Sequence, residues 1–384
     1  MNRRCLIVAC MLAVLGYGTS GDVVRAANTP RCAGWPNWSA FKEDFLQPDG
    51  RVIDYSAAAH STSEGQAYAL FFALVANDRA AFHQILTWTE SNLAAGDFAS
   101  RLMAWQWGKR VDGTWGVMDG NSASDADVWL AYTLYQAGQL WQDPALRQSA
   151  DQLRARIERD LVVPVQGVGL VLLPGTQGFE LDAGGWQLNP SYLPLSALKG
   201  LAHESPDGPW QQLTRSTLTL FDAVTPHHLV PDWVAVRPGQ GFLLDASVGH
   251  SGSYDAIRVY LWAGMMSDKD PDKARLLRRL TGMKSALASD PLPPERIDAR
   301  TGKREGTGPI GFSAALLPFL DSLGAGQAAN RQRQRLNTLQ RVPKAYFERA
   351  LVLFALGWTE KRFRFDRDGQ LLPGCWASQT KNGP

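Results

Sequence analysis

The sequence is poor in cysteine, in histidine and in net charge. Its 384 residues include 4 Cys and 6 His, and 39 Lys and Arg balance 37 Asp and Glu, which gives a formal net charge of +2. The histidines form no H-E-x-x-H pattern, and His227-His228 is more typical of a loop than of a metal site, so no metal or other cofactor is expected. A near-neutral chain also lacks the basic field that nucleic-acid binding needs, so no such partner is expected.

A membrane-spanning helix needs about 20 apolar residues, and the N-terminal apolar run is only about half that long. This run, residues 6–15, follows Arg3 and Arg4 and precedes small residues around Val24-Arg25-Ala26, which is the pattern of an export signal and its cleavage site. We therefore expect residues 1–26 to be removed. The mature protein is then periplasmic or secreted, without a membrane anchor.

Only Cys32 and Cys375 remain once residues 1–26 are removed. They lie near opposite ends of the mature chain. In an oxidising compartment they can form one disulfide that joins the two ends, and two free thiols are the alternative.

Aromatic residues, in contrast, are abundant, with 14 Trp and 9 Tyr. Such large amphipathic rings are costly to expose and usually serve packing or stacking. Neutral ligands that stack on flat rings are therefore worth considering.

Segments with helical periodicity alternate between two kinds along the chain. Residues 64–76, 128–137 and 257–266 are apolar on all sides, as expected of helices that are buried all round. Each is followed by a segment with a single apolar stripe, which is typical of a half-exposed helix. The stripes are formed by Phe82, Ile85, Leu86 and Leu93, then by Leu146, Ala150, Leu153, Ile157 and Leu161, and then by Leu276, Leu277, Leu280, Met283 and Leu287.

This alternation predicts six helical hairpins in one domain, residues 27–384, with inner helices surrounded by outer ones. Asp143-Pro144 and Asp270-Pro271 are expected to open two outer helices, each as an N-cap followed by a first-turn proline. Residues 162–173 are rich in Val and Leu and end at Pro174-Gly175, which predicts a strand or hairpin that decorates a loop. The fold class is therefore all-α with a small β decoration.

Three acidic residues stand at the starts of the three fully apolar segments: Glu64, Asp125 and Asp255. All inner helices of such a ring run the same way, so the three carboxyls are expected to converge on one opening. Each acid alone is explained by helix capping, because Ser61-x-x-Glu64 is a capping box and Ser122-x-x-Asp125 resembles one. Their recurrence near aromatic-rich loops favours a functional site.

Two carboxyls beside an aromatic-lined cleft are what the hydrolysis of a glycosidic bond requires. The flat faces of sugar rings stack on Trp and Tyr, and the nearby candidates are Trp105, Trp107, Trp115, Trp186, Tyr192 and Trp233, of which about half are expected to line a groove.

The neighbours of each acid suggest a division of roles. Arg258 lies three residues after Asp255 on the same helix face and is expected to keep Asp255 ionised. Glu64 has no cation at the corresponding positions, so burial and a nearby Asp125 are expected to favour its protonated form. Asp127 points elsewhere and is expected to cap a helix or tie a loop.

At these residues the sequence resembles glycoside hydrolase family eight. The resemblance covers most of the mature chain and includes the aspartate signature Ala123-Ser124-Asp125-Ala126-Asp127, followed by Ala131, Leu134, Ala137 and Trp141, whereas Leu130, Thr133 and Tyr135 depart from it. It implies an (α/α)6 barrel fold. It also implies an endo-β-1,4-glucanase that hydrolyses β-1,4-glucan (cellulose) chains and inverts the anomeric configuration.

Carried over by position, the resemblance implies that Glu64 is the proton donor and Asp255 is the general base. Asp125 matches the aspartate traditionally called the nucleophile, which in an inverting enzyme holds the sugar and tunes Glu64. Tyr254 and Arg258 match residues beside the base. Inversion leaves room for a water, so the Glu64 and Asp255 carboxyls are expected to lie roughly 6.5–9.5 Å apart.

The family also implies a role beside bacterial cellulose synthesis, with the cellulose synthase complex as a partner, and we expect a monomer. The non-enzymatic alternative is a glucan-binding or assembly subunit of an export complex. Within the enzyme class, xylan, chitosan and mixed-linkage glucan remain alternative substrates, because a shared barrel does not fix the sugar.

Overall fold

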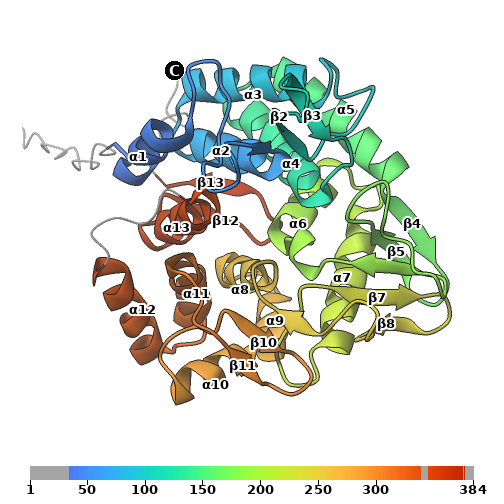
Figure 1. Cartoon of the computed structure of the whole chain (residues 1–384), viewed down its shortest axis with the longest axis vertical. Coiled ribbons are helices and arrows are strands. Elements are labelled where there is room, and N and C mark those ends of the chain that lie inside the picture. The colour runs from blue at the N-terminus through green and yellow to red at the C-terminus, as the bar shows by residue number, and fades with distance from the viewer. Residues whose placement is uncertain (1–33, 339–344, 375, 377–384) are drawn as a thin grey trace, which may run out of the picture. The chain divides into compact units, whose positions relative to one another are not determined.

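The computed structural model describes residues 34–338, 345–374 and 376, which contain thirteen α-helices and several short strands (Figure 1). Residues from Gly34 onward form one compact unit. The expected export signal, Cys32 and Cys375 lie outside the described residues. Among the helices of the described part, none has both the length and the apolar character that crossing a bilayer requires.

Six helices form a closed inner ring, because each contacts the next in chain order and the last contacts the first. In Figure 1 they surround a common centre. The expected all-round burial holds along them. They are α2 (Ser63–Val75), α4 (Ser124–Leu140), α6 (Leu195–Glu204), α8 (Ala256–Met265), α11 (Ile310–Ser322) and α13 (Tyr346–Thr359).

Each inner helix contacts an outer one that precedes or follows it in the chain, so the predicted (α/α)6 barrel is confirmed. The sixth pair joins the two ends of the described chain, because α1 packs on α13. The outer helices are α1 (Pro36–Phe45), α3 (Arg79–Leu93), α5 (Pro144–Asp160), α7 (Trp210–Val224), α9 (Lys273–Arg279) with α10 (Thr281–Ser289), and α12 (Gly326–Thr338).

The two Asp-Pro pairs behave differently. Asp143 caps α5 as predicted, accepting from the backbone N–H groups of Ala145 and Leu146 at 2.9 and 3.4 Å. Asp270 Oδ1 accepts from the backbone N–H of Asp272 at 2.9 Å, as a cap would, and also binds the Lys199 ammonium at 2.5 Å. The predicted helix start was wrong, because α9 begins only at Lys273. The third outer stripe also forms two helices, which break at Leu280.

The strands are short and lie in the loops between helices. The predicted hairpin at 162–173 is present as β4 (Val162–Val165) and β5 (Gly169–Leu172). The remaining strands are β1 (Ser61–Thr62), β2 (Gln106–Lys109), β3 (Trp115–Asp119), β6 (Trp186–Leu188), β7 (Val234–Arg237), β8 (Gly241–Leu243), β9 (Ser251–Gly252), β10 (Arg296–Asp298), β11 (Arg304–Glu305), β12 (Phe363–Phe365) and β13 (Leu371–Pro373).

One small sheet fixes the start of α2 relative to the tryptophan-rich loop. Strand β1, which leads directly into α2, pairs antiparallel with β2, so that Ser61 faces Trp107 and Thr62 faces Gln106. Strand β3 continues the sheet on the other side of β2. The backbone ladder therefore holds Trp107 and Trp115 in register with the segment that carries Glu64.

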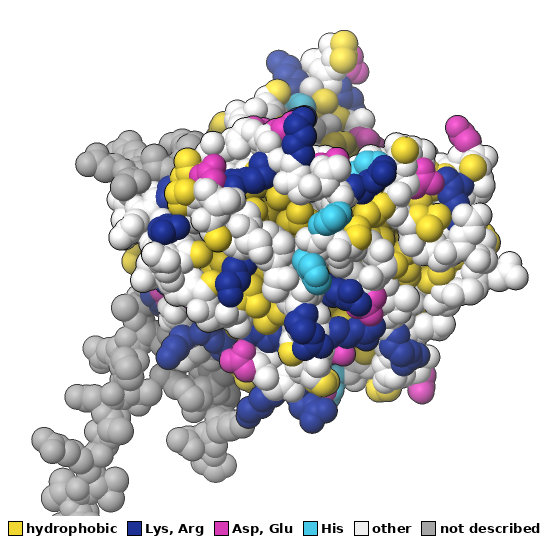
Figure 2. All heavy atoms as spheres, turned by 90° about the horizontal axis from the view of Figure 1, so that it is seen from below, with side chains coloured by type: hydrophobic (Ala, Val, Ile, Leu, Met, Phe, Trp, Pro, Cys, Tyr) yellow, Lys and Arg dark blue, Asp and Glu magenta, His cyan; other side chains and the backbone are white. Residues whose placement is uncertain are grey.

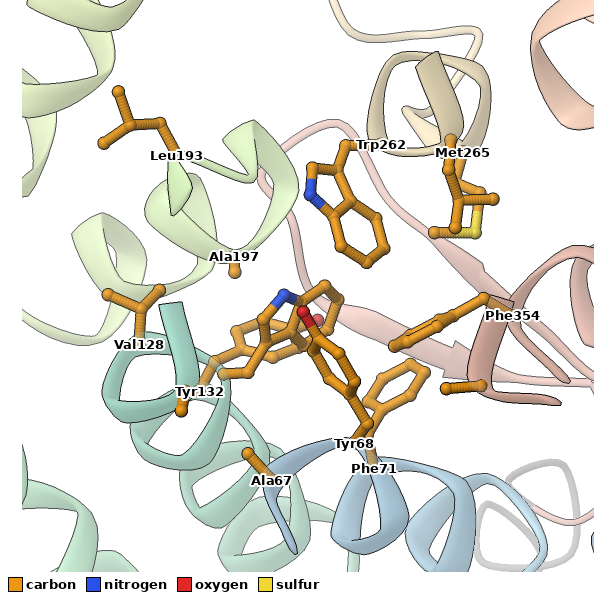
Figure 3. Packing of buried hydrophobic residues seen from close by; sticks show 14 of the residues in the cluster. Ala67, Tyr68, Phe71, Val128, Tyr132, Leu193, Ala197, Trp262, Met265 and Phe354 are labelled. Atoms are coloured by element: carbon orange, nitrogen blue, oxygen red, sulfur yellow. The ribbon is translucent and has the colours of Figure 1, made fainter. Parts of the chain in front are cut away.

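Aromatic rings fill the axis of the barrel (Figure 3). Trp129 of α4 lies between Tyr68 of α2, at a centroid distance of 6.2 Å, and Trp262 of α8, at 5.2 Å. Phe354 of α13 packs on Trp262 at 5.1 Å. Rings from four inner helices thus interlock in a dry core, and this core forms the floor beneath the N-terminal ends of those helices.

The surface is not uniformly charged, although the whole chain is nearly neutral. The face shown in Figure 2 carries many Lys and Arg side chains, with acidic and histidine side chains among apolar and uncharged atoms. The acidic side chains at the helix starts are described next.

Candidate active site

The three candidate carboxyls stand at the beginnings of neighbouring or facing inner helices. Glu64 is in the first turn of α2, Asp125 is in the first turn of α4, and Asp255 immediately precedes α8. Because the inner helices are parallel, their N-termini meet at one end of the barrel. The predicted convergence of these residues is therefore present.

Helix capping does not account for these carboxyls. The α2 cap is Thr62, whose hydroxyl accepts from the Gly65 N–H at 3.2 Å, whereas the Ser61 hydroxyl donates to the Val52 carbonyl. The Ser122 hydroxyl has no hydrogen-bond partner. Both predicted capping boxes were wrong, since the serine in each stands too far outside its helix.

A single guanidinium connects two of the carboxyls. Arg258 Nη1 donates to Asp125 Oδ2 at 3.0 Å, and Arg258 Nη2 donates to Asp255 Oδ1 at 2.5 Å. The same guanidinium donates to the Tyr68 hydroxyl at 3.3 Å and to the Ser191 hydroxyl at 2.9 Å. The predicted contact between Arg258 and Asp255 is thus part of a larger network that reaches three other helical segments.

The charges of this cluster favour the retention of one proton. Three carboxyls face one guanidinium, so the fully ionised cluster would carry two uncompensated negative charges in a poorly solvated site. Burial raises the pKa of Glu64, and the negative charge of Asp255 raises it further. Burial and the charge of Glu64 likewise raise the pKa of Asp125.

The three carboxyls differ in their contacts with Arg258. Arg258 binds both aspartates directly and donates no hydrogen bond to Glu64 among the contacts of the described residues. Arg258 still lowers the pKa of Glu64 from a distance, as does a hydrogen bond from Trp105, so the expectation that no cation acts on Glu64 was wrong. Burial outweighs both effects, so the pKa of Glu64 is raised.

The two aspartates differ in their access to solvent. The Asp255 side chain is 28% exposed, whereas that of Asp125 is 1% exposed. Asp125 also accepts a hydrogen bond from the Tyr68 hydroxyl at 3.5 Å and from the backbone N–H of Ala126 at 2.9 Å. Water can therefore reach Asp255, while Asp125 is suited to holding other groups in place.

The fourth acid, Asp127, ties a loop to α4. Its Oδ1 accepts from the backbone N–H of Met103 at 3.2 Å, two residues before Trp105. The Asp127 side chain is fully buried, and its Oδ2 has no hydrogen-bond partner. Burial accordingly raises the pKa of Asp127 well above its usual range. This matches the expected loop tie.

An aromatic cavity of about 260 Å³ lies beside the cluster. None of the three carboxyls lines it, but its wall includes Trp105, which hydrogen-bonds to Glu64, and Tyr192, whose ring centre lies 5.5 Å from the Arg258 guanidinium. Trp105, which lies in the loop held by Asp127, forms part of its wall, and this indole is 38% exposed. Phe179 and Trp233 stack at a centroid distance of 5.9 Å. The lining residues are Trp105, Asp119, Asn121, Ser122, Ala123, Pro174, Phe179, Tyr192 and Trp233.

The other predicted aromatics are divided between surface and core. Trp115 is 50% exposed and stacks on the half-buried Trp107, and Arg51 lies within 5 Å of both ring centres. Trp186 is half-buried against the core. Tyr254 is exposed, packs on Phe312, and directs its hydroxyl to Glu295 at 3.4 Å.

Sequence reasoning missed three contributors to the site. Tyr68 lies in the middle of an apolar helix and is therefore expected to be a core residue. Ser191 lies outside the α-helices, and Phe179 has no motif around it. A signal existed only for Tyr68, because a hydroxyl buried within an apolar helix needs a polar partner. Within the described part of the chain, no group of three or more His, Cys, Asp or Glu is arranged to hold a metal ion.

An (α/α)6 barrel with several carboxyls gathered beside an aromatic cavity is the arrangement that hydrolysis of a glycosidic bond requires. Comparison with known proteins identifies the family. The family model described as glycosyl hydrolases family 8 matches residues 23–361. The chain belongs to glycosyl hydrolase family 8.

Its relatives cover nearly the whole chain. It is similar to an endoglucanase of Escherichia coli (strain K12), with 46% identity over 94% of this chain and 96% of that protein. An endoglucanase of Xanthomonas axonopodis pv. citri is 44% identical over 97% of both chains. The crystal structure of an endo-1,4-D-glucanase from Vibrio fischeri ES114 matches with a TM-score of 0.83 and 40% identity, and covers 88% of this chain and 99% of that one.

Proposed function

We propose that this enzyme hydrolyses internal β-1,4 bonds of glucan chains with inversion, using Glu64 as the general acid and Asp255 as the general base. The observation that carries the proposal is that Arg258 forms ion pairs with Asp125 and Asp255 directly but not with Glu64. A single site thus offers one group to donate a proton and another to accept one.

In the proposed reaction Glu64 donates its proton to the glycosidic oxygen as the bond from that oxygen to C1 breaks. Asp255 accepts a proton from the water that attacks C1 from the opposite face of the ring, so a β bond yields an α product. Asp255 regains its ionised form by losing that proton to solvent, and Glu64 takes one up. The partial exposure of Asp255 supports the entry of water.

Asp125 is proposed to position rather than to attack. It is buried beneath the other two carboxyls, and its oxygens already accept hydrogen bonds from Arg258, Tyr68 and the Ala126 N–H. Its ion pair with Arg258 holds that guanidinium in place, and burial and the charge of Glu64 raise the pKa of Asp125.

The aromatic cavity supports a sugar chain as the substrate. We propose that Trp105 and Tyr192 contact sugar rings beside the cleaved bond, and that Trp107 and Trp115 contact rings farther along the chain. Tyr254 and Arg258 are proposed to bind the sugar beside the base, Asp255. Exposed indoles stack on the apolar faces of pyranose rings, while Asp119 in the same wall offers a carboxylate oxygen to sugar hydroxyls.

A reducing-sugar assay on carboxymethylcellulose tests the proposal with the wild type, Glu64→Gln and Asp255→Asn. The wild type is expected to release reducing ends, and both variants are expected to lose nearly all of this activity. Equal signals from all three proteins would favour a glucan-binding subunit and would contradict the proposed roles.

The sugar is tested by comparing β-1,4-glucan with xylan, chitosan and mixed-linkage glucan at equal mass concentrations. The highest kcat/KM is expected on β-1,4-glucan. A higher value on one of the other three polymers would keep the acid and base roles but replace the proposed substrate.

The proposal extends to location and biological role. We propose that residues 1–26 direct export to the periplasm or beyond, and that the enzyme trims glucan during bacterial cellulose synthesis, alongside the synthase complex. Fractionation of cells that express the full chain tests the first part, with the processed protein expected outside the cytoplasm. Co-purification with the synthase tests the proposed role alongside that complex. If the two proteins repeatedly fail to co-purify even after cross-linking, direct contact between them is contradicted.

A further inference from the structure

The proposed base, Asp255, occupies a position at which aspartate usually caps its own helix. It directly precedes Ala256, the first residue of α8, but its side chain makes no capping hydrogen bond. Its carboxylate instead reaches forward to Arg258. Helix N-termini nevertheless leave backbone N–H groups that need acceptors, so another group must serve this end of α8.

That group is Asp232, from the loop just before β7. Asp232 Oδ1 accepts from the backbone N–H of Ala256 at 2.7 Å and from that of Ser253 at 2.8 Å. The backbone N–H of Asp232 also donates to the Ser251 carbonyl at 2.8 Å. Three hydrogen bonds from one residue therefore hold the segment that carries Asp255 from both sides.

A comparison within the molecule shows what this arrangement prevents. Asp125 stands at the start of α4 much as Asp255 stands at the start of α8, and no side chain caps α4, although the Pro174 carbonyl accepts from its first N–H, that of Ser124, at 2.8 Å. There the Asp125 carboxylate turns back and accepts the N–H of the next residue, Ala126, at 2.9 Å. At α8 the corresponding N–H, that of Ala256, is already bound by Asp232.

We propose that Asp232 is a positioning residue that caps α8 in place of Asp255, and thereby keeps the Asp255 carboxylate directed at Arg258 and the attacking water. This inference rests on the proposed role of Asp255 as the base. The neighbouring Trp233 lines the aromatic cavity, so the same loop joins the cavity wall to the base.

The charged groups that face Asp232 agree with this role. Burial raises the pKa of Asp232 to about 6, the negative charge of Asp255 contributes to the rise, and Arg258 and the two backbone N–H groups oppose it. The ionised form accepts the stronger hydrogen bonds, so Asp232 is an effective cap at neutral pH.

Kinetics of Asp232→Ala and Asp232→Asn test the proposal. Asp232→Ala removes the acceptor, and kcat on a soluble glucan is expected to fall about 100-fold, as for a misplaced reacting group, with KM changed less than about twofold. Asp232→Asn keeps an Oδ1 acceptor, and its kcat is expected to stay within about threefold of the wild type. Equal losses in the two variants, or a loss confined to KM, would overturn the proposal.

Asp366 provides a matched control, because its Oδ1 also accepts from two backbone N–H groups, those of Asp368 and Gln370, at 2.9 and 2.8 Å. It lies beyond the C-terminal end of an inner helix. Asp366→Ala is expected to lower the melting temperature and to leave kcat unchanged. A similar fall of kcat in Asp366→Ala would mean that the loss in Asp232→Ala reflects stability alone.

A crystal structure of Asp232→Ala tests positioning without relying on activity. The Asp255 carboxylate is expected to turn one oxygen back to the Ala256 N–H, as Asp125 does at α4 while its other oxygen binds Arg258. An Asp255 carboxylate that keeps its wild-type position and makes no contact with the Ala256 N–H would overturn the inference even if the enzyme acted on another polymer. If the alanine variant does not fold, Asp232→Leu, which has a similar size and no acceptor, takes its place in both experiments.

Discussion

Arg258 Nη1 and Asp125 Oδ2 lie 3.0 Å apart, although 133 residues separate them in the chain. Their ion pair is almost wholly buried, and Arg258 also holds Asp255. The contact therefore joins α4 to α8 across the mouth of the barrel. It sets the geometry and the charge of the site at once, and five predictions follow from this arrangement and its surroundings.

Replacing Arg258 by Met is expected to lower the free energy of unfolding by about 3–5 kcal/mol at pH 7, because it leaves buried carboxylates unpaired. The loss is expected to be smaller at pH 5, where protons can neutralise the carboxyls instead. Urea denaturation at both pH values measures this. The control is Arg275→Met, which removes an exposed pair with Asp222 and is expected to cost less than about 1 kcal/mol. Equal losses at both pH values would contradict the predicted electrostatic origin.

Glu64→Gln is expected to reduce kcat about 10²- to 10⁴-fold on cello-oligosaccharides, because it removes the proton for the leaving oxygen. On an aryl cellobioside with an acidic phenol the loss is expected to be much smaller, since that leaving group needs no proton. Initial rates on both substrates give the comparison, and Glu90→Gln, on outer helix α3, serves as the control. Equal losses on the two substrates would rule out a general acid at position 64.

The stereochemistry of the product follows from the space between Glu64 and Asp255. If the two carboxyls lie roughly 6.5–9.5 Å apart, a water fits between Asp255 and the sugar, and the first product is the α anomer. Proton NMR during the first minutes of cellopentaose hydrolysis detects this anomer before mutarotation. Initial release of the β anomer, or a gap near 5 Å in a crystal structure, would point to retention.

Trp105→Ala is expected to raise KM for cellopentaose about tenfold and to change kcat less, because the exposed indole contributes binding through its face. Steady-state kinetics on a series of cello-oligosaccharides measure this effect. Trp358→Ala removes a half-buried indole near the end of α13, away from the helix starts, and is expected to affect stability without affecting KM. An unchanged KM in Trp105→Ala would remove this residue from the proposed sugar site.

Asp127→Asn is expected to flatten the pH dependence of stability. The folded-state pKa of Asp127 is raised, so the folded protein holds more protons than the unfolded chain, and its stability falls as the pH rises above the unfolded value of about 4. Each pH unit within this window costs about 1.4 kcal/mol. Free energies of unfolding at pH 5, 6 and 7 are expected to show a shallower slope in Asp127→Asn, and parallel lines for the two proteins would contradict the assignment.

The sequence predicts the inner helices well because burial on all sides leaves a long run of apolar residues, which a half-exposed helix does not show. Residues 64–76, 128–137 and 257–266 lie within one residue of α2, α4 and α8 or inside them. The shared direction of the inner helices then places Glu64, Asp125 and Asp255 at one end. Most of the site is therefore a consequence of the helix pattern.

Local capping was harder to predict, because several hydroxyls compete within a few residues. Ser61 and Thr62 are both acceptable caps, and only the pairing of β1 with β2 leaves Thr62 to cap α2. Asp270 Oδ1 is shared between the Asp272 N–H and the ammonium of Lys199, which is 71 residues away. Contacts of this kind depend on tertiary structure, as does the capping of α8 by Asp232, and no spacing along the chain reveals them.

The packing of α1 on α13 brings the first and the last helix of the barrel into contact. A growing or translocating chain that has not yet produced residues 346–359 lacks Phe354, and with it one ring of the central aromatic cluster. The three acids are all present by then, but the floor beneath them is incomplete. Hydrolysis must therefore await the last helix, so the enzyme becomes active only when the whole barrel has been synthesised.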